Sequence, residues 1–511
     1  MTKRPNLIVV TSDQQRSDCY GFAGRKIKTP HLDMMAQQGT HFPNCITSSV
    51  VCQPARAGIL TGLLPQTHGV WDNGVDLRDD VGAAGFAGRL SQSGYDTAFL
   101  GKAHFSTMHT FEPTGRPECS RSSDLYGPDW YGPYMGFDHV ELVVMGHNRN
   151  KPLEPPFGQH YDRWFYGDGL GDWKWDRYLT RTGPDAGAAQ TLQSGLPSAF
   201  HNSTWTADRA IEYLREKRSS DRPFAAWISF PDPHHPFDAP EPWSRMHDPD
   251  EIDLPKHRER DLDRRPWWHR AALEGTPQLA DPKMLAHRAK NSRVPEQTEE
   301  QLRHMIANYY SMISLIDHNF GRIQIALRDY GLADDTIVIY TSDHGDWLGD
   351  HGLILKGPML YEGLLTVGAI VQGPGVPPGK TVSAPVSNMD IAATFLDYGR
   401  ADDGAALHGR SLRPLVETDT ATRDFALNEW KMHPSRTGIS LDLRCVRTET
   451  AKLTIDRMSG AGEMYDLAND PDEMINLFDD PGYAKLRTEL EDMIASRPAD
   501  EVELVEPVGM A

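Results

Sequence analysis

Two apolar segments, far apart in the chain, indicate the class of fold. Residues 6–11 are Asn-Leu-Ile-Val-Val-Thr and lead into Asp13 and Gln14, whereas residues 336–341 are Thr-Ile-Val-Ile-Tyr-Thr and lead into Asp343 and His344. Such uninterrupted apolar runs are typical of strands that a parallel sheet buries on both faces. The carboxyl ends of parallel strands form the ligand-binding edge of an α/β sheet, so we expect the two polar pairs to lie together at that edge.

Segments between these strands have the marks of helices that could cover such a sheet. Thr29, Pro30 and Gly39 delimit one helix, and apolar residues recur at helical spacing from Leu302 to Leu327. Further helices are expected near 87–94, 205–216 and 390–398, and further strands near 97–100, 224–230 and 367–371. We therefore predict an α/β fold with a large mixed, mainly parallel sheet flanked by helices.

The chain is predicted to contain two structural units. Residues 1–416 carry the α/β pattern, interrupted near 105–203 and 240–295 by loop-rich insertions without clear periodicity. In residues 417–511, short strands near 440–446, 451–455 and 464–467 precede a helix near 484–494. This second pattern predicts a small C-terminal α+β subdomain with an antiparallel sheet.

Charge and cysteine content exclude several classes of function. The 511-residue chain has a formal net charge of −20, which argues against nucleic acid or an anionic membrane as a partner. An anionic substrate would therefore need a local positive site. Residues 7–10 are too short an apolar run for a signal peptide, and no segment is long enough to cross a bilayer. Five scattered cysteines suit a reducing compartment, so we expect a cytoplasmic protein.

One cysteine stands in an unusual local setting. Cys52 precedes Pro54 by two residues and Arg56 by four, and the apolar stretch that follows ends at Gly62. Pro54 suits the first turn of a helix, so Cys52 is expected at the positive end of that helix, beside a fixed cation. A lone cysteine is usually a buried core residue. The spacing in this segment indicates instead an anion site built around one sulfur atom.

The segment Cys52-Gln53-Pro54-Ala55-Arg56 resembles the signature of the type I sulfatases, in which the cysteine is oxidised to formylglycine. The commonest form of that family has serine where this chain has Ala55. Four further segments resemble family motifs in the expected order, namely residues 101–104, 233–237, 341–345 and 464–467. The resemblance implies an alkaline phosphatase-like fold and places the chain near the phosphonate monoester hydrolases and choline sulfatases.

The resemblance also implies a metal site. One divalent ion would be held by Asp13, Gln14, Asp343, His344 and the modified residue at position 52. Carboxylate and amide oxygens suit Ca²⁺, with Mg²⁺ as an alternative, and the single imidazole tilts the choice somewhat toward Mn²⁺.

Catalytic and substrate-binding roles follow from the same resemblance. Arg56 and Lys102 would support the nucleophile, and His104 would transfer a proton. Lys356 and His234 would contact the sulfuryl oxygens and the leaving group, and Asn73 would also bind the substrate. By contrast, His235 and His351 are expected to be structural.

The implied reaction is hydrolysis of aryl or alkyl sulfate monoesters. The hydrate of formylglycine has two hydroxyls: one attacks sulfur to give a covalent sulfo-enzyme, and the other, once deprotonated, expels sulfate. A metal, fixed cations and a positioned acid would help the leaving group depart. Maturation would require a formylglycine-generating enzyme, and we expect a homo-oligomer.

Two other functions compete with this interpretation. Gln14, His344 and the loop at residues 71–74 are also similar to phosphonate monoester hydrolases and phosphodiesterases, whereas Lys102 and His104 are sulfatase-like. Each activity is expected as a side reaction of the other, because both substrates are monoanionic tetrahedral esters. A non-catalytic binding protein on the same fold would be natural if the cysteine or a metal ligand were missing, and none is.

Overall fold

The two apolar strands predicted from the sequence are neighbours at the centre of the main sheet. In this computed structural model, which describes residues 3–144, 159–291, 294–401 and 407–510, β1 (Asn6–Ser12) pairs in parallel with β10 (Thr336–Ser342). Ser12 lies opposite Ser342 in this register. The polar residues that follow the two strands therefore emerge at the same edge, as predicted.

The main sheet has eight strands and is mixed. Beyond β1 the pairing stays parallel, whereas β11 runs antiparallel to β10. The spatial order is β12 (Lys380–Thr381), β2 (Thr40–Phe42), β11 (Ala369–Gln372), β10, β1, β8 (Phe224–Ser229), β4 (Asp96–Gly101) and β6 (His139–Leu142). This topology confirms the predicted fold class.

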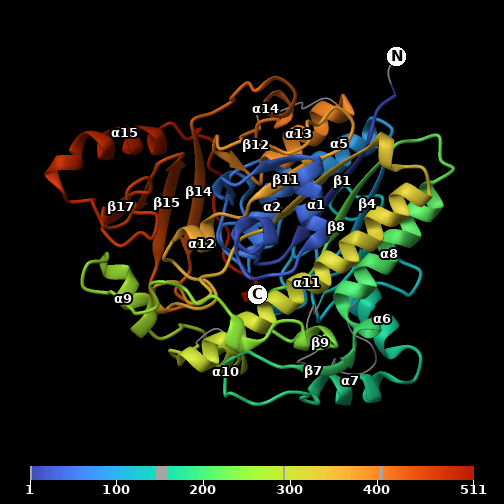
Figure 1. Ribbon diagram of the computed structural model, residues 1–511, viewed down its shortest axis with the longest axis horizontal. Coiled ribbons are helices and arrows are strands. Elements are labelled where there is room, and N and C mark those ends of the chain that lie inside the picture. The colour runs from blue at the N-terminus through green and yellow to red at the C-terminus, as the bar shows by residue number, and fades with distance from the viewer. Residues whose placement is uncertain (1–2, 145–158, 292–293, 402–406, 511) are drawn as a thin grey trace.

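Helices cover both faces of the sheet (Figure 1). Ile8 and Val10 of β1 pack toward α1 (Pro30–Gln38), α8 (Asn202–Lys217) and α11 (Glu299–Asp329). Leu7 and Val9 pack toward the face that carries α2 (Cys52–Thr61), α5 (Phe86–Gln92) and α13 (Asp390–Gly399). The alternation explains the apolar run, because each side chain of the central strand enters one of two cores. Short elements complete this unit: β3 (Cys45–Ile46), α3 (Pro65–His68), α4 (Asp79–Ala83), α12 (Glu362–Leu365), β13 (Val386–Ser387) and α14 (Arg413–Thr418).

The predicted insertions contain regular structure. The segment near 105–203 supplies β6, an edge strand of the main sheet, in addition to α6 (His160–Tyr166), α7 (Gly171–Leu179) and β7 (Ser194–Pro197). Residues 145–158 of this segment lie outside the described residues. The second insertion forms β9 (Pro240–Glu241), α9 (Trp267–Glu274) and α10 (Pro282–Asn291).

The C-terminal region forms a separate antiparallel sheet. Its strands are β14 (Phe425–Met432), β15 (Leu441–Thr448), β16 (Ala451–Asp456) and β17 (Gly462–Asp466), and α15 (Ala484–Ala495) packs against β15 and β16. The sheet and its helix confirm the predicted α+β subdomain. The exact division between residues 416 and 417 stays a prediction.

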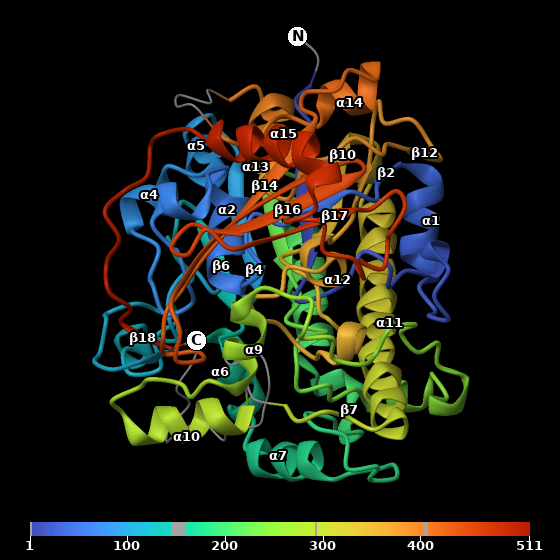
Figure 2. The ribbon, with the colours of Figure 1, turned by 90° about the vertical axis from the view of Figure 1, so that its left-hand side faces the viewer.

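The chain after α15 leaves this subdomain and returns to the first unit (Figure 2). There β18 (Gly509–Met510) pairs antiparallel with β5 (His109–Thr110). The predicted bounds of the subdomain, residues 417–511, include this tail. Among the described residues, none of the helices combines the length and the apolar composition needed to cross a membrane.

Candidate active site

The predicted cysteine helix forms as expected. Cys52 is the first residue of α2 and is almost fully buried. At the other end Gly62 adopts a left-handed conformation with φ 70°, and its N–H bonds the carbonyl of Gly58 at 2.8 Å. The sulfur of Cys52 therefore lies at the positive end of a buried helix.

Potential metal ligands converge on this sulfur from the edge of the main sheet. Asp13, Cys52, Asp343 and His344 are all buried, and their ligand atoms lie within 4.8 Å of one another. Nδ1 of His344 faces the carbonyl of Gly345 at 2.8 Å, and a carbonyl only accepts, so this nitrogen carries the proton. Its Nε2 faces Sγ of Cys52 at 3.1 Å.

Arg56 lies beneath the cluster and binds both carboxylates. Its Nε donates to Asp343 at 2.9 Å and its Nη2 to Asp13 at 3.1 Å. Nζ of Lys102 also contacts Asp13, at 2.5 Å. Burial by itself would raise the pKa of Asp13, but Lys102 and Arg56 outweigh it and hold the pKa well below its usual range. Both cations thus keep Asp13 ionised in the protein interior.

Lys356 brings a further positive charge into the cluster. Its ammonium lies 3.0 Å from Oε1 of Gln14, 3.2 Å from Sγ of Cys52 and 3.3 Å from Nε2 of His344. Burial and Asp13 oppose ionisation of the Cys52 thiol, yet Lys356, His344 and Lys102 together hold its pKa well below the usual range. The site therefore stabilises a negative charge on the terminal side-chain atom of residue 52.

The donor set fits a divalent cation. Carboxylate oxygens, an amide oxygen and an imidazole nitrogen are ligands of Ca²⁺, Mg²⁺ and Mn²⁺. The contacts of the Lys356 ammonium show that three of the donor atoms already point toward one positive centre. Gln14 reaches this position from a left-handed backbone conformation with φ 72°, which is uncommon for a residue other than glycine and is typical of functional sites.

His104 lies beside the sulfur on a loop after β4. Its backbone is also left-handed, with φ 53°. The carboxylate of Glu118 accepts the N–H groups of residues 104, 105 and 106 and thereby fixes the loop. Burial lowers the pKa of His104, and an interaction with Cys52 partly offsets the effect. Within the described residues, Nδ1 of His104 has no hydrogen-bond partner.

The contacts of the other predicted residues are as follows. The carboxamide oxygen of Asn73 accepts the backbone N–H of Gln53 at 3.0 Å, at the start of α2. The rings of His234 and His235 stack with centroids 4.1 Å apart. The ring of His351 stacks on Tyr361 at 3.8 Å.

Besides Glu118, Asp346 and Asn388 support the site without having been predicted from the sequence. Asp346 is fully buried, accepts N–H groups of Leu348 and Leu355, and receives a hydrogen bond from Nε2 of Gln14. It thus connects Gln14 to the loop that ends at Lys356. Nδ2 of Asn388 donates to the carbonyl of Asp343 at 3.0 Å. Asp346 lies three residues after Asp343, and this proximity was the one available signal.

Comparison with known proteins matches the site to a family. The family model described as Sulfatase matches residues 5–400. The chain belongs to the sulfatase family. A second model, described as N-sulphoglucosamine sulphohydrolase, C-terminal, matches residues 349–499 of this sulfatase and so includes the antiparallel sheet.

Relatives of this sulfatase span nearly its whole length. It is 28% identical to an arylsulfatase of Clostridium perfringens, over 94% of this chain and 91% of the relative. It is 26% identical to a choline-sulfatase of Rhizobium meliloti, over 94% and 83% of the two chains. The crystal structure of a phosphonate monoester hydrolase of Agrobacterium radiobacter superposes with a TM-score of 0.75 at 26% identity, covering 98% of this chain and 96% of that one. The protein is accordingly a sulfuric ester hydrolase of the alkaline phosphatase superfamily.

Proposed function

We propose that this sulfatase hydrolyses aryl or alkyl sulfate monoesters with residue 52 as the nucleophile, after oxidation of Cys52 to formylglycine. One observation carries the proposal: Sγ of Cys52 lies at a helix N-terminus, 3.1 Å from His344 and 3.2 Å from Lys356. A hydrated aldehyde at this position would supply two hydroxyl groups in a pocket that stabilises negative charge. A formylglycine-generating enzyme would carry out the maturation.

Asp13, Gln14, Asp343 and His344 would hold one divalent ion, with Ca²⁺ as the first candidate. When bound, the ion would supply Lewis acidity next to the sulfuryl oxygens. Arg56 holds the two carboxylates in place through an ion pair with each. Lys102 neutralises Asp13 from the other side.

The remaining residues would handle the substrate and its protons. Lys356 would bind a sulfuryl oxygen, because its ammonium faces the nucleophile. His104 lies close enough to Cys52 to take a proton from residue 52, and burial favours its neutral, basic form. His234 would contact the leaving group, and Asn73 would fix the start of α2 while bordering the substrate.

Phosphonate monoester hydrolysis is the second candidate. It is supported by the similarity to the Agrobacterium radiobacter enzyme and by the amide ligand Gln14. Lys102 and His104 favour sulfate ester hydrolysis. The ammonium of Lys102 is cationic, the imidazole of His104 can become so, and both lie beside the nucleophile. Sulfate and phosphonate esters share their charge and shape, so a minor phosphonate hydrolase activity is expected.

A comparison of two substrates tests the proposal. The measurement is kcat/KM for nitrophenyl sulfate and for a nitrophenyl phenylphosphonate, in the parent enzyme and in Cys52→Ala. We expect the parent to prefer the sulfate and the variant to lose both activities. A preference for the phosphonate by orders of magnitude would replace the sulfatase assignment with the second candidate.

The metal site is tested by Asp343→Ala. This change removes a charged ligand and leaves β10 intact, so bound metal and activity should be lost while the far-ultraviolet circular dichroism stays the same. Asp335→Ala is the matched control, because Asp335 precedes the other end of β10 and pairs with Lys3 at the surface. Full metal content in Asp343→Ala, measured by elemental analysis, would exclude the proposed ligand set.

We also propose a homo-oligomer. Its contact surface would lie on α6 and α7, where large apolar side chains are exposed: Trp164, Leu170, Trp173 and Leu179. Light scattering that gives the mass of one chain would exclude this assembly.

A further inference from the structure

A cavity borders the site on the side of Lys356. It has a volume of about 420 Å³ and is lined by α9, α10, the loop at 347–359 and the C-terminal sheet. Lys356 belongs to both sites, because its stem lines the cavity and its ammonium contacts Sγ of Cys52. The cavity is large enough for a small organic group, and Lys356 connects it to the proposed nucleophile.

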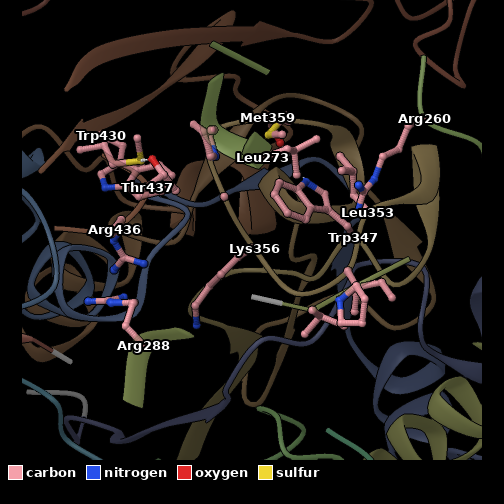
Figure 3. A pocket seen from close by; sticks show the side chains of 17 residues that line it. Arg260, Leu273, Arg288, Trp347, Leu353, Lys356, Met359, Trp430, Arg436 and Thr437 are labelled. Atoms are coloured by element: carbon pink, nitrogen blue, oxygen red, sulfur yellow. Dashed lines mark hydrogen bonds between the residues drawn. The ribbon is translucent and has the colours of Figure 1, made fainter. Parts of the chain in front are cut away.

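Two arginines lie on one wall of this cavity (Figure 3). Arg288 comes from α10, and Arg436 follows β14 in the C-terminal region. In Figure 3 the two guanidinium groups lie close together, and Lys356 extends toward them. The wall therefore concentrates positive charge in a protein whose formal net charge is −20.

The charge of Arg288 is only partly balanced by the surrounding described residues, through Asp72, which also binds Arg436. Arg288 is only 5% exposed, and its Nε has no hydrogen-bond partner among them. Burial, together with repulsion from Arg436, lowers the pKa of Arg288 to about 9. A buried cation that is only partly balanced is costly, so this residue would gain from an anion in the cavity.

Arg436 is only partly neutralised. Its Nε donates to Asp72 at 3.0 Å, but its Nη2 is buried without a partner among the described residues. The same carboxylate also accepts from Nε1 of Trp430 and from the backbone N–H of His433. One carboxylate thus serves two arginines, and no acidic side chain is found among the described residues that line the cavity.

The rest of the cavity is largely apolar. Trp347, Leu353 and Met359 line it on the side away from Arg288 and Arg436, where Arg260 also lies, and Trp430 lies under the guanidinium of Arg436 at 5.3 Å. Tryptophan faces bind flat or ring-shaped groups. The cavity therefore offers an apolar surface for a ring and a cationic wall for a negative charge at the far end of that ring.

We propose that this cavity binds the leaving group of the substrate, and that this leaving group carries an anionic substituent held by Arg288 and Arg436. The inference rests on the proposed function, because the leaving group belongs to the ester that the same nucleophile attacks. It makes the preferred substrate a sulfate ester with a second negative charge. It also excludes choline sulfate as a good substrate, because a quaternary ammonium would meet two arginines.

Three substrates that differ only in charge test the inference. They are phenyl sulfates with a para carboxymethyl, carbamoylmethyl or trimethylammoniomethyl group, in which the methylene keeps the phenol acidities similar. We expect the parent to hydrolyse the carboxylate with kcat/KM about 10- to 100-fold above the amide, as for a hydrogen bond to a charged group. The ammonium ester should be the poorest substrate.

Arg288→Gln assigns the effect to the cavity. It should lower kcat/KM for the carboxylate about 10- to 100-fold, chiefly through KM, and change the amide by less than about threefold. Arg270→Gln is the matched control, because this arginine is exposed on α9, pairs with Asp263 at 3.1 Å and is not among the residues that line the cavity. Equal kcat/KM for the three esters in the parent, or an equal loss for all of them in Arg288→Gln, would overturn the inference.

A binding measurement separates this inference from the proposed function. Calorimetry with para-hydroxyphenylacetate and its amide needs neither the oxidised residue nor turnover. Tighter binding of the acid by the parent, lost in Arg288→Gln, supports the anion site even if none of the esters is hydrolysed. Equal affinity for acid and amide would overturn it even in a fully active sulfatase.

Discussion

Arg56 illustrates how one buried side chain can organise the centre of this protein. Its guanidinium binds Asp13, Asp343, the hydroxyl of Ser229 and the carbonyl of Lys102, so its donors point away from the space beside Cys52. The sequence analysis expected Arg56 to support the nucleophile. The contacts indicate that this support is indirect and acts through the two carboxylates.

His104→Ala tests the proposed proton transfer. Loss of a general base typically costs about 10²- to 10⁴-fold in rate, so kcat for nitrophenyl sulfate should fall by this amount with little change in melting temperature. Added imidazole should restore part of the rate. His31→Ala, on α1 at the other face of the sheet, is the control. Normal sulfate turnover in His104→Ala would show that another group moves the proton.

The sequence was enough to find the site residues that belong to motifs. It was not enough to find the residues that hold those side chains in place. Asp13 and Asp343 follow buried strands, so their meeting at one edge was predictable from the parallel pairing. Glu118 lies in a region without periodicity and acts through three backbone N–H groups, a contact that depends on loop geometry alone. The residues around Arg288 form no recognisable motif. Arg288 matters for binding because it lies near Arg436, which is distant in the sequence.

At the level of elements, α2 depends on a contact from outside the helix. Asn73 accepts the N–H of Gln53, and the side chain of Gln53 in turn accepts the N–H of Gly74 at 2.7 Å. The pair fixes the loop at residues 71–74 to the start of α2 and satisfies one of the unpaired N–H groups there.

Asn73→Ala should therefore destabilise the protein. Loss of a capping contact costs about 1 kcal/mol, and the start of α2 should become less well positioned, so that kcat falls as well. Asn44→Ala is the control, because Asn44 is partly exposed and bonds only a surface loop. If Asn73 contacted only the substrate, KM alone would change and thermal unfolding would be unaffected.

Asp162 gives α6 a pH-dependent stability. Burial raises its pKa to about 7, and its Oδ2 has no hydrogen-bond partner among the described residues. The folded state thus binds this proton more tightly than the unfolded state, whose pKa is about 3.9. The stabilising contribution of the protonated carboxyl is complete below about pH 4 and is lost as the pH rises through 7.

Asp162→Asn keeps the side chain neutral at every pH. We expect it to stabilise the protein by on the order of 2 kcal/mol at pH 8 and to have little effect at pH 4. Thermal unfolding at the two pH values measures the difference, and Asp176→Asn on the exposed side of α7 is the control. Equal effects of Asp162→Asn at both pH values would contradict the assignment.

At the level of the whole molecule, the sequence predicted the layers better than the connections between them. The sheet, its helices and the C-terminal subdomain follow from periodicity and from apolar runs. β6 was not predicted, because four residues within a Gly- and Trp-rich segment give no clear period, and they become a strand only through pairing with β4. The return of the C-terminal tail to β5 is likewise a purely tertiary contact.

Removal of residues 502–511 tests the role of that tail. Val502 donates to the carbonyl of Gln66, Val508 donates to that of Gly74, and Nε1 of Trp71 donates to the carbonyl of Val505. Each hydrogen bond contributes about 1 kcal/mol. The shortened protein should melt at a lower temperature and, since these contacts border the loop at 71–74, should show a raised KM. An unchanged melting temperature and KM would show that the tail is dispensable.

The central claim is that the chemistry takes place at residue 52. The most direct measurement is mass spectrometry of the peptide that carries this residue, isolated from catalytically active enzyme. The account predicts an aldehyde in place of the thiol, in a fraction of molecules that scales with specific activity. An unmodified Cys52 thiol in fully active enzyme would contradict it.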